Sequence, residues 1–294
     1  MKFRGLTKLF KLSFDNWLKH NATRLGAALA FYTIWSIAPL VVLAVSVVAL
    51  FLSKSAAQTH LLDEVQALMG SQSRDAIQMI LAHGYKFSSG VWSTVFGFIT
   101  LFLGASGVFQ ELRSDLNDIW EVDPMATSGW KAMLRERLFS FGLVLSVGFV
   151  LLVSLLVSAA LAAFSKFFGG ILPLSSWLLM VFNEVVSLVG IGILFALILK
   201  YVPVCRVEWK DVRVGAAITA VLFMLGKTAL GFYLGRSSTT SSYGAAASLV
   251  VLVIWVYYSA QIFYFGAEFT HVHALANRGR LAQLPRPEVD KKAA

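Results

Sequence analysis

The stretch WVYYSAQIFYFGAEF, residues 255–269, is almost wholly apolar and aromatic, yet it contains Gln261 and Glu268. It belongs to an apolar run at 243–270, which is longer than the roughly 20 residues that a helix needs to cross a bilayer. A polar side chain in such a helix costs free energy unless it is paired or hydrated, so each one is a candidate functional residue. The stretch therefore predicts a membrane-spanning helix with a polar feature built into it.

The rest of the chain has the same character. Only 14% of the 294 residues are charged, well below the proportion typical of soluble domains. We therefore expect an all-α membrane protein with six transmembrane helices. The expected spans are residues 25–52, 91–109, 138–164, 177–199, 213–234 and 243–270.

Positive charge alternates between the connecting segments. Lys and Arg number 19 in 1–24, 110–137, 200–213 and the tail, against 5 in the other three segments. This asymmetry follows the positive-inside rule and predicts that both termini face the cytoplasm (N-in/C-in). It also explains most of the net charge of +9, so we expect membrane lipids as partners and no nucleic acid.

The amphipathic cytoplasmic segment 1–24 precedes the transmembrane domain, 25–270. Phe10, Phe14 and Trp17 recur in it at helical spacing, with lysines on other faces. This pattern predicts a helix lying on anionic lipid, and the alternative is a plain basic leader that only sets the topology. At the other end, residues 271–294 form a basic cytoplasmic tail.

The loop 53–90 is expected to be an external helical hairpin that folds back over the membrane bundle. Ser55 and Gln58 have capping-box spacing, and an apolar face then runs to a stop at Gly70. A second short helix is expected from Arg74 to the residue before Gly84.

A cytoplasmic acidic helix is predicted at 111–123. Glu111, Asp115 and Asp118 share one of its faces, and three carboxylates in a row could bind Mg²⁺. The alternative, a solvated acidic face without a ligand, is the commoner arrangement, so we predict no metal site.

In the last span, Tyr257, Gln261, Tyr264 and Glu268 are spaced by four, three and four residues, which places them on one helix face. The alternative to a cavity lining is aromatic packing with internally paired hydroxyls. Tyr32, Ser36 and Pro39 likewise share a face of the first span. We predict that the first and last helices line a cavity. The candidate lining residues are Tyr32, Ser36, Pro39, Tyr257, Gln261 and Tyr264.

Charged residues suggest two further contacts. Arg24, at the start of the first span, should lie level with Glu268, which predicts a pair at the inner mouth. Glu184 and Lys227 each lie seven residues, or about 10 Å, from the outer end of their antiparallel spans. They could form a gating pair, a structural ion pair, or no pair at all if Lys227 extends outward to water.

Catalytic motifs are missing from the sequence. It contains no Walker A loop, GxGxxG, HExxH or GxSxG motif, and its one cysteine, Cys205, cannot form an internal disulfide. We therefore expect neither a cofactor nor an enzymatic activity.

Four blocks of sequence resemble the BrkB/YihY family of bacterial inner-membrane proteins, once labelled ribonuclease BN. They are RLGAALAFYTIWSIAPLVVL (24–43), ELRSDLNDIWEV (111–122), LRERLFSFGLVLSVGFVLLVSLLVSAALAA (134–163) and SSYGAAASLVVLVIWVYYSAQIFYFGAEFTHVHA (241–274). The resemblance implies six helices, an inner-membrane location and a permease or envelope role with lipid-linked cargo suggested.

From these observations we expect a transporter for a lipid or anionic amphiphile of the envelope. The alternatives are a non-catalytic scaffold whose hairpin at 53–90 binds a partner, and a membrane-bound ribonuclease. A homo-oligomer is also open. The ribonuclease would have to use cytoplasmic groups such as His20, His271 and His273, and no cytoplasmic loop is long enough to build an RNA cleft.

Overall fold

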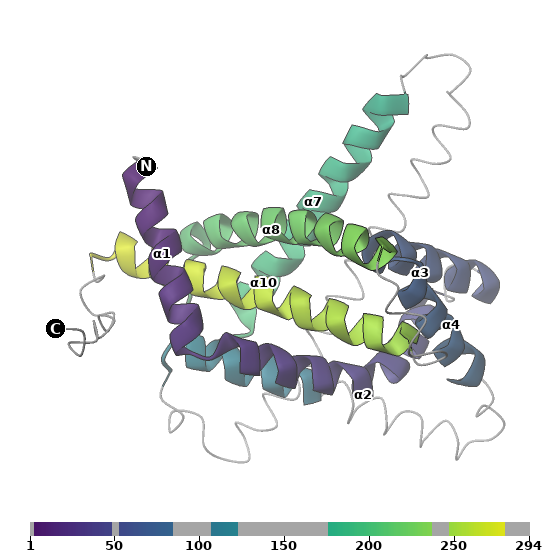
Figure 1. Ribbon diagram of the computed structural model, residues 1–294. Coiled ribbons are helices and arrows are strands. Elements are labelled where there is room, and N and C mark those ends of the chain that lie inside the picture. Colours follow the sequence, from purple (N-terminus) through teal and green to yellow (C-terminus); the bar gives the residue numbers. More distant parts are fainter. Residues whose placement is uncertain (1–2, 49–52, 85–106, 123–175, 237–246, 280–294) are drawn as a thin grey trace.

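Figure 1 shows the computed structural model, which describes residues 3–48, 53–84, 107–122, 176–236 and 247–279. These residues form helices and short turns, with no strand among them. One helix covers residues 107–119. The other helices are α1 (Phe3–Lys19), α2 (Ala22–Val48), α3 (Lys54–Met69), α4 (Ser71–Gly84), α7 (Ser176–Tyr201), α8 (Trp209–Arg236) and α10 (Ala247–Asn277).

Within these ranges, three helices are long and apolar enough to cross a membrane. Their apolar windows are Glu184–Tyr201 of α7, Trp209–Leu230 of α8 and Ser248–Asn277 of α10. They coincide with the last three predicted spans, and α2, with 27 residues, occupies the first. The second and third predicted spans, 91–109 and 138–164, lie outside the described residues except for 107–109. The chain is thus a helical membrane protein in the part that the structure describes.

α10 is the central helix. It runs between α8 and α2, which lie along its two sides (Figure 1). Leu25 of α2, Leu199 of α7, Val212 of α8 and Phe263 of α10 belong to one buried apolar cluster, which also takes in Leu116 of the 107–119 helix. Close packing of these side chains holds the five helices against one another, because lipid tails are as apolar as the side chains and give no hydrophobic driving force between helices.

α8 and α10 approach closely at two reciprocal glycine–threonine contacts. The Thr219 hydroxyl donates to the carbonyl of Gly215 at 2.8 Å, and the Thr270 hydroxyl donates to the carbonyl of Gly266 at 2.7 Å. A Cβ at Gly266 would overlap Thr219, and one at Gly215 would overlap Thr270. Small residues that let two backbones approach are typical of helix pairs in membranes.

α3 and α4 form the hairpin predicted at 53–90. Gly70 lies between them with φ of 87°, which an L side chain would adopt only with strain. The N-cap of α3 is Ser53, whose hydroxyl accepts from the backbone of Ala56 at 3.3 Å, so the predicted capping role of Ser55 is wrong. Ser55 instead lies inside the first turn. α4 begins at Ser71, three residues before the predicted start.

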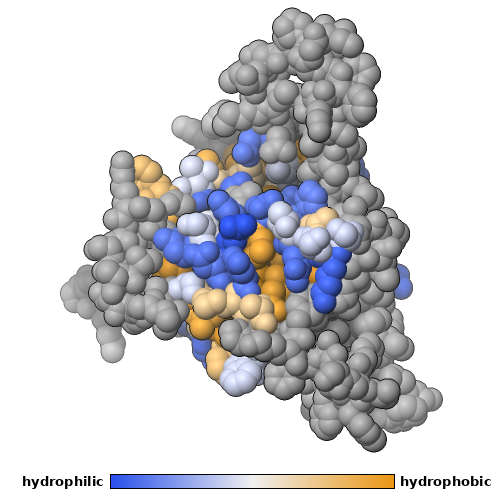
Figure 2. Space-filling model, turned by 90° about the vertical axis from the view of Figure 1, so that its right-hand side faces the viewer, coloured by the Kyte–Doolittle hydropathy of each residue, from blue (hydrophilic) through white to orange (hydrophobic). Residues whose placement is uncertain are grey.

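The hairpin packs against α2 and α10. Val45, Leu62, Ile77 and Leu252 belong to a second buried apolar cluster, separate from the central one. Seen from this end, the surface of the described residues is mainly hydrophilic, with an apolar strip between the hydrophilic patches (Figure 2).

α1 crosses the end of the bundle (Figure 1). The chain turns sharply between α1 and α2 at Asn21, whose φ is 50°. Asparagine is one of the few non-glycine residues that adopts this left-handed conformation readily. The turn brings α1 across the C-terminal part of α10, where Phe10 packs against Phe269 with ring centroids 5.1 Å apart.

Candidate functional site

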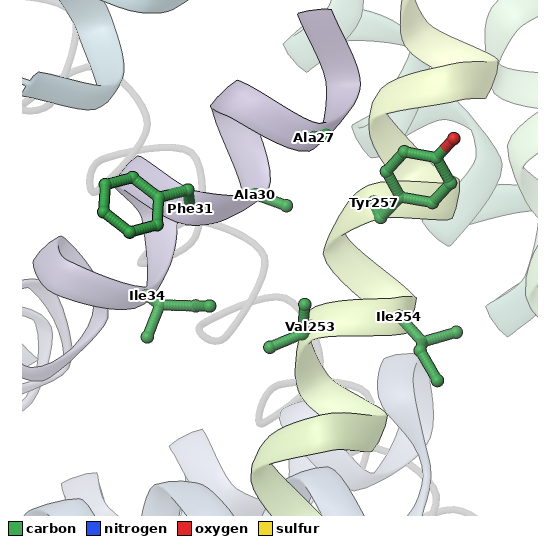
Figure 3. Close-up of a pocket in the computed structure, with 7 residues that line it drawn as sticks. All are labelled: Ala27, Ala30, Phe31, Ile34, Val253, Ile254 and Tyr257. Carbon is green, nitrogen blue, oxygen red and sulfur yellow. The ribbon is translucent and has the colours of Figure 1, made fainter. Parts of the chain in front are cut away.

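A groove of about 280 Å³ lies between α2 and α10 and is open to the surface. α2 contributes Ala27, Ala30, Phe31 and Ile34, and α10 contributes Val253, Ile254 and Tyr257 (Figure 3). The lining is almost entirely apolar, and the Tyr257 hydroxyl is the one polar side-chain group among these seven residues. The groove exists because Ala27 and Ala30 have small side chains, which leave space beside the larger residues of α10. A groove of this kind can hold a hydrocarbon chain.

One turn further along α10, the same helix face is closed. The side-chain amide of Gln261 donates to the backbone carbonyl of Ala22 at 3.2 Å. Gly26 makes this contact possible, because a Cβ there would overlap the Gln261 amide. Gln261 therefore joins α10 to the start of α2 and does not face an open cavity.

Tyr264 is fully buried and donates a hydrogen bond to the carboxyl group of Asp115 on the 107–119 helix. The pKa of Asp115 is raised to about 7, chiefly by burial and also by the neighbouring Glu111 and Asp118. The Tyr264 hydrogen bond and the positive charge of Arg24 act in the opposite direction. Asp115 is therefore a buried carboxyl group that exchanges a proton near neutral pH.

Glu268 is also fully buried. Its carboxylate lies 2.5 Å from Nδ1 of His20, and the His20 Nε2 lies 3.9 Å from Glu121. The hydrogen bond to Glu268 raises the pKa of His20 above its usual 6.5, against the effect of burial. The second carboxylate oxygen of Glu268 has no hydrogen-bond partner in the described part of the chain.

We call Gln261, Tyr264 and Glu268, with their partners Ala22, Asp115 and His20, the polar seam. All three α10 residues face the same way and each joins a different segment to α10. Nine residues beyond Tyr264, His273 lies 3.4 Å from the buried Asp211 of α8. Asn277 donates to the same carboxylate at 2.6 Å, so the end of α10 is fixed to the start of α8.

The predicted pair of Arg24 and Glu268 is not what the structure shows. Among the described residues, no ion pair joins them, and His20 occupies the position beside Glu268. The reason is the turn at Asn21, which directs the end of α1 toward α10 and leaves Arg24 exposed on α2. Arg24 acts electrostatically on Asp115.

Glu184 and Lys227 are likewise not joined by an ion pair in the described ranges, and Glu184 is exposed. α7 crosses α8 at a steep angle, and its N-terminal half leaves the bundle (Figure 1). Equal depth on consecutive helices therefore does not bring these side chains together, because the helices separate toward that end.

The first helix contributes differently from the prediction. Tyr32 is exposed and its ring lies beside Gly107, and the buried Ser36 hydroxyl donates to the carbonyl of Tyr32 at 3.0 Å. Ser36 thus satisfies a backbone group of its own helix and is not a groove residue. Pro39 lies in α2, and its side chain is outside the described residues.

The three acidic residues of the 107–119 helix do not converge. No group of three or more His, Cys, Asp or Glu that could hold a metal ion occurs within the described ranges. Asp115 is buried against Tyr264, whereas Asp118 is exposed.

Sequence reasoning missed the partners of the seam. In the sequence, His20 is one of the cytoplasmic histidines and Asp115 belongs to the row of three acidic residues. Nothing in their spacing indicates that they meet Glu268 and Tyr264. Spacing places His273 and Asn277 on one face of α10, and a carboxylate such as Asp211 is favoured in the first turn of a helix, but neither signal indicates that they meet.

Known proteins are similar in sequence to this chain over most of its length. A UPF0761 membrane protein of Actinobacillus pleuropneumoniae serotype 5b is 25% identical over 279 residues, covering 93% of this chain and 96% of that protein. One of Paraburkholderia xenovorans is 28% identical over 240 residues, covering 80% of this chain and 52% of that protein. One of Tolumonas auensis is 32% identical over 200 residues, covering 65% of this chain and 62% of that protein.

The chain spans about half to three fifths of the length of several of its relatives, among them the proteins of Paraburkholderia xenovorans and Tolumonas auensis. No solved structure matches. The model of the family described as virulence factor BrkB matches residues 13–291, which include α2, α10 and every residue of the groove and the polar seam. The chain therefore belongs to the BrkB family of membrane proteins.

Proposed function

We propose that this protein is a bacterial inner-membrane transporter, with both termini in the cytoplasm, for an amphipathic and anionic lipid or lipid-like molecule of the envelope. The observation that carries the proposal is the groove between α2 and α10. It is apolar, it is open to the surface between two helices, and it lies within the apolar window of α10. A hydrocarbon chain in the bilayer could enter it without crossing water.

The polar seam supports the same function. An amphiphile with its chain in the groove would bring its head group toward Gln261, Tyr264 and Glu268, which continue along the same face of α10. In the described conformation Tyr264 and Glu268 are fully buried. Moving a head group past them requires α1 or the 107–119 helix to shift, which is the conformational change that we assign to transport.

The test is lipid movement in vesicles that contain the purified protein. A fluorescent phosphatidylglycerol in the inner leaflet becomes accessible to an added reductant only after it crosses the bilayer. We expect protein-dependent crossing, slowed several-fold by Ala27→Trp, which would fill the groove. Ala217→Trp, an exposed position on α8, is the matched control and should keep the wild-type rate.

Protein-containing vesicles that move neither anionic nor zwitterionic lipids faster than empty vesicles would contradict the proposal. Equal slowing by Ala27→Trp and Ala217→Trp would show that the groove is not the transport path. If transport failed while replacement of the hairpin formed by α3 and α4 abolished function in cells, the scaffold alternative would be favoured.

A further inference from the structure

α1 has an outward face that no other described segment covers. Leu9, Ser13 and Asn16 are buried on its inner face, against the bundle. On the opposite face Phe14 is 50% exposed and Leu18 is 54% exposed, and the two are spaced four residues apart, on one strip of the helix. α1 therefore exposes large apolar side chains in addition to those that it packs.

Basic residues border this strip. Lys8 and Lys11 are exposed, and neither forms an ion pair within the described ranges. Lys19 is also exposed and lies 3.5 Å from Glu121. The one carboxylate on α1, Asp15, is half-buried. The outward face thus combines apolar side chains with an excess of positive charge, two lysines against one half-buried carboxylate.

The position of α1 along α10 matches the edge of a bilayer. Phe10 of α1 packs against Phe265 and Phe269 of α10, with ring centroids 5.9 Å and 5.1 Å apart. From Ser248, where the apolar window of α10 begins, to Glu268 the helix rises about 30 Å. A bilayer's hydrocarbon core is about 30 Å thick, so α1 packs on α10 where the hydrocarbon ends.

The direction of α1 fits the same position. α1 runs crosswise to α2, α8 and α10 (Figure 1). When α8 and α10 cross the membrane, α1 therefore lies nearly in the plane of the membrane surface. A helix in that plane can insert apolar side chains between lipids while its lysines remain among the head groups.

We infer that the outward face of α1, formed by Lys8, Lys11, Phe14 and Leu18, binds the surface of the bilayer and selects anionic phospholipids. Phe14, stacked on Trp17 with ring centroids 5.7 Å apart, enters the acyl region together with Leu18. Lys8 and Lys11 contact lipid phosphates. The inference stands independently of transport, because it needs only the placement of α1.

The first experiment measures depth in nanodiscs that contain phosphatidylglycerol and phosphatidylcholine. Single cysteines at Phe14→Cys or Leu18→Cys, in a Cys205→Ser background, carry a nitroxide label. We expect high accessibility to oxygen and low accessibility to a water-soluble nickel complex, as for Leu225→Cys on the exposed face of α8. Ser114→Cys, on the exposed side of the 107–119 helix, is the aqueous reference.

Labels at both 14 and 18 that are as accessible to nickel as the label at 114 would overturn the inference. Dipolar broadening between labels at position 14 would also overturn it, because the face would then meet a second copy of the chain. Two labelling positions are used so that a folding defect in one variant does not decide the result.

The second experiment measures lipid selectivity, from the fraction of spin-labelled phosphatidylglycerol and phosphatidylcholine bound to the full-length protein. Each lysine near an anionic surface favours binding by about fivefold, so Lys8→Gln with Lys11→Gln should lower the selectivity clearly. Arg206→Gln with Lys210→Gln removes the same charge from exposed positions elsewhere and should leave selectivity unchanged. Equal losses in the two double variants would contradict a site on α1.

Discussion

The groove and the polar seam lie on the same face of α10, only one turn apart, and they differ in what covers them. At Val253 and Tyr257, the groove is lined on its other side by α2 among the described residues, and the small side chains of α2 leave an open space (Figure 3). At Tyr264 and Glu268, the 107–119 helix and the end of α1 also lie opposite, and both side chains are fully buried.

This comparison shows that the spacing along α10 determines which residues share a face but not whether that face is open. Exposure depends on how many segments converge on each turn. In the seam, every α10 side chain has found a partner on another segment, as buried polar groups generally must. The following experiments test whether the two regions differ energetically as their surroundings predict.

The largest effect is expected from His20→Ala. It leaves the buried Glu268 carboxylate without its partner, and breaking one side of a buried pair costs about 3–5 kcal/mol. The measurement is the free energy of unfolding in detergent micelles at neutral pH. Lys19→Ala, beside it, removes only an exposed pair with Glu121 and should cost less than about 1 kcal/mol. Similar losses of stability in both variants would show that the buried pair in the polar seam contributes no more than an exposed pair.

The next effect is a pH dependence that comes from Asp115. Its pKa is about 7 in the folded protein and near 3.8 when exposed, so the folded state holds the extra proton between these values. Stability should therefore fall as the pH rises from about 4 to about 7, by at most about 4 kcal/mol, and then level off.

Asp115→Asn should remove this slope, because the amide oxygen can still accept from Tyr264 without ionising. His20 contributes stability at low pH that is lost above 6.5, as the pH rises through its raised pKa, and this part should remain in the variant. Unfolding measured from pH 4 to pH 8 in both proteins separates the two groups. An unchanged slope in Asp115→Asn would refute the assignment.

Two tyrosine substitutions compare the regions directly. Tyr264→Phe removes a hydrogen bond to a buried carboxyl group and should cost about 1.5–3 kcal/mol. Tyr257→Phe removes a hydroxyl that borders an open groove and should change stability by less than about 0.5 kcal/mol. Thermal unfolding of the two variants is the measurement. A larger loss of stability for Tyr257→Phe than for Tyr264→Phe would contradict the assignment of the open groove and the closed seam.

The smallest effect is expected from Gly26→Ala. The new methyl group would displace the flexible Gln261 amide and break its hydrogen bond to Ala22, at a cost of about 1 kcal/mol. The comparison is Gly190→Ala on α7, where a methyl group meets nothing within 4 Å. That change should be neutral or slightly stabilising, because alanine favours helix over glycine.

In the part of the chain that the structure describes, the sequence predicted the long helices well because their signals are local. Apolar runs located α7, α8 and α10, and Gly70 ended α3 where expected. The shared face of Gln261, Tyr264 and Glu268 also follows from helical spacing alone.

The partners were not predictable, because they depend on turns and crossing angles between distant segments. A single left-handed residue, Asn21, decides that His20 and not Arg24 meets Glu268. The divergence of α7 from α8 decides that Glu184 and Lys227 are not paired. Neither feature has a signature in residue spacing.

The central claim is that the groove receives a hydrocarbon chain whereas the seam is closed. The most direct measurement is photo-crosslinking in nanodiscs with a phospholipid that carries a diazirine in its acyl chain, followed by mapping of the modified residues by mass spectrometry. We predict adducts on groove residues such as Phe31, Ile34 and Tyr257, and none on Tyr264. Adducts on Tyr264 as frequent as those on Tyr257, or a groove without adducts, would contradict the account.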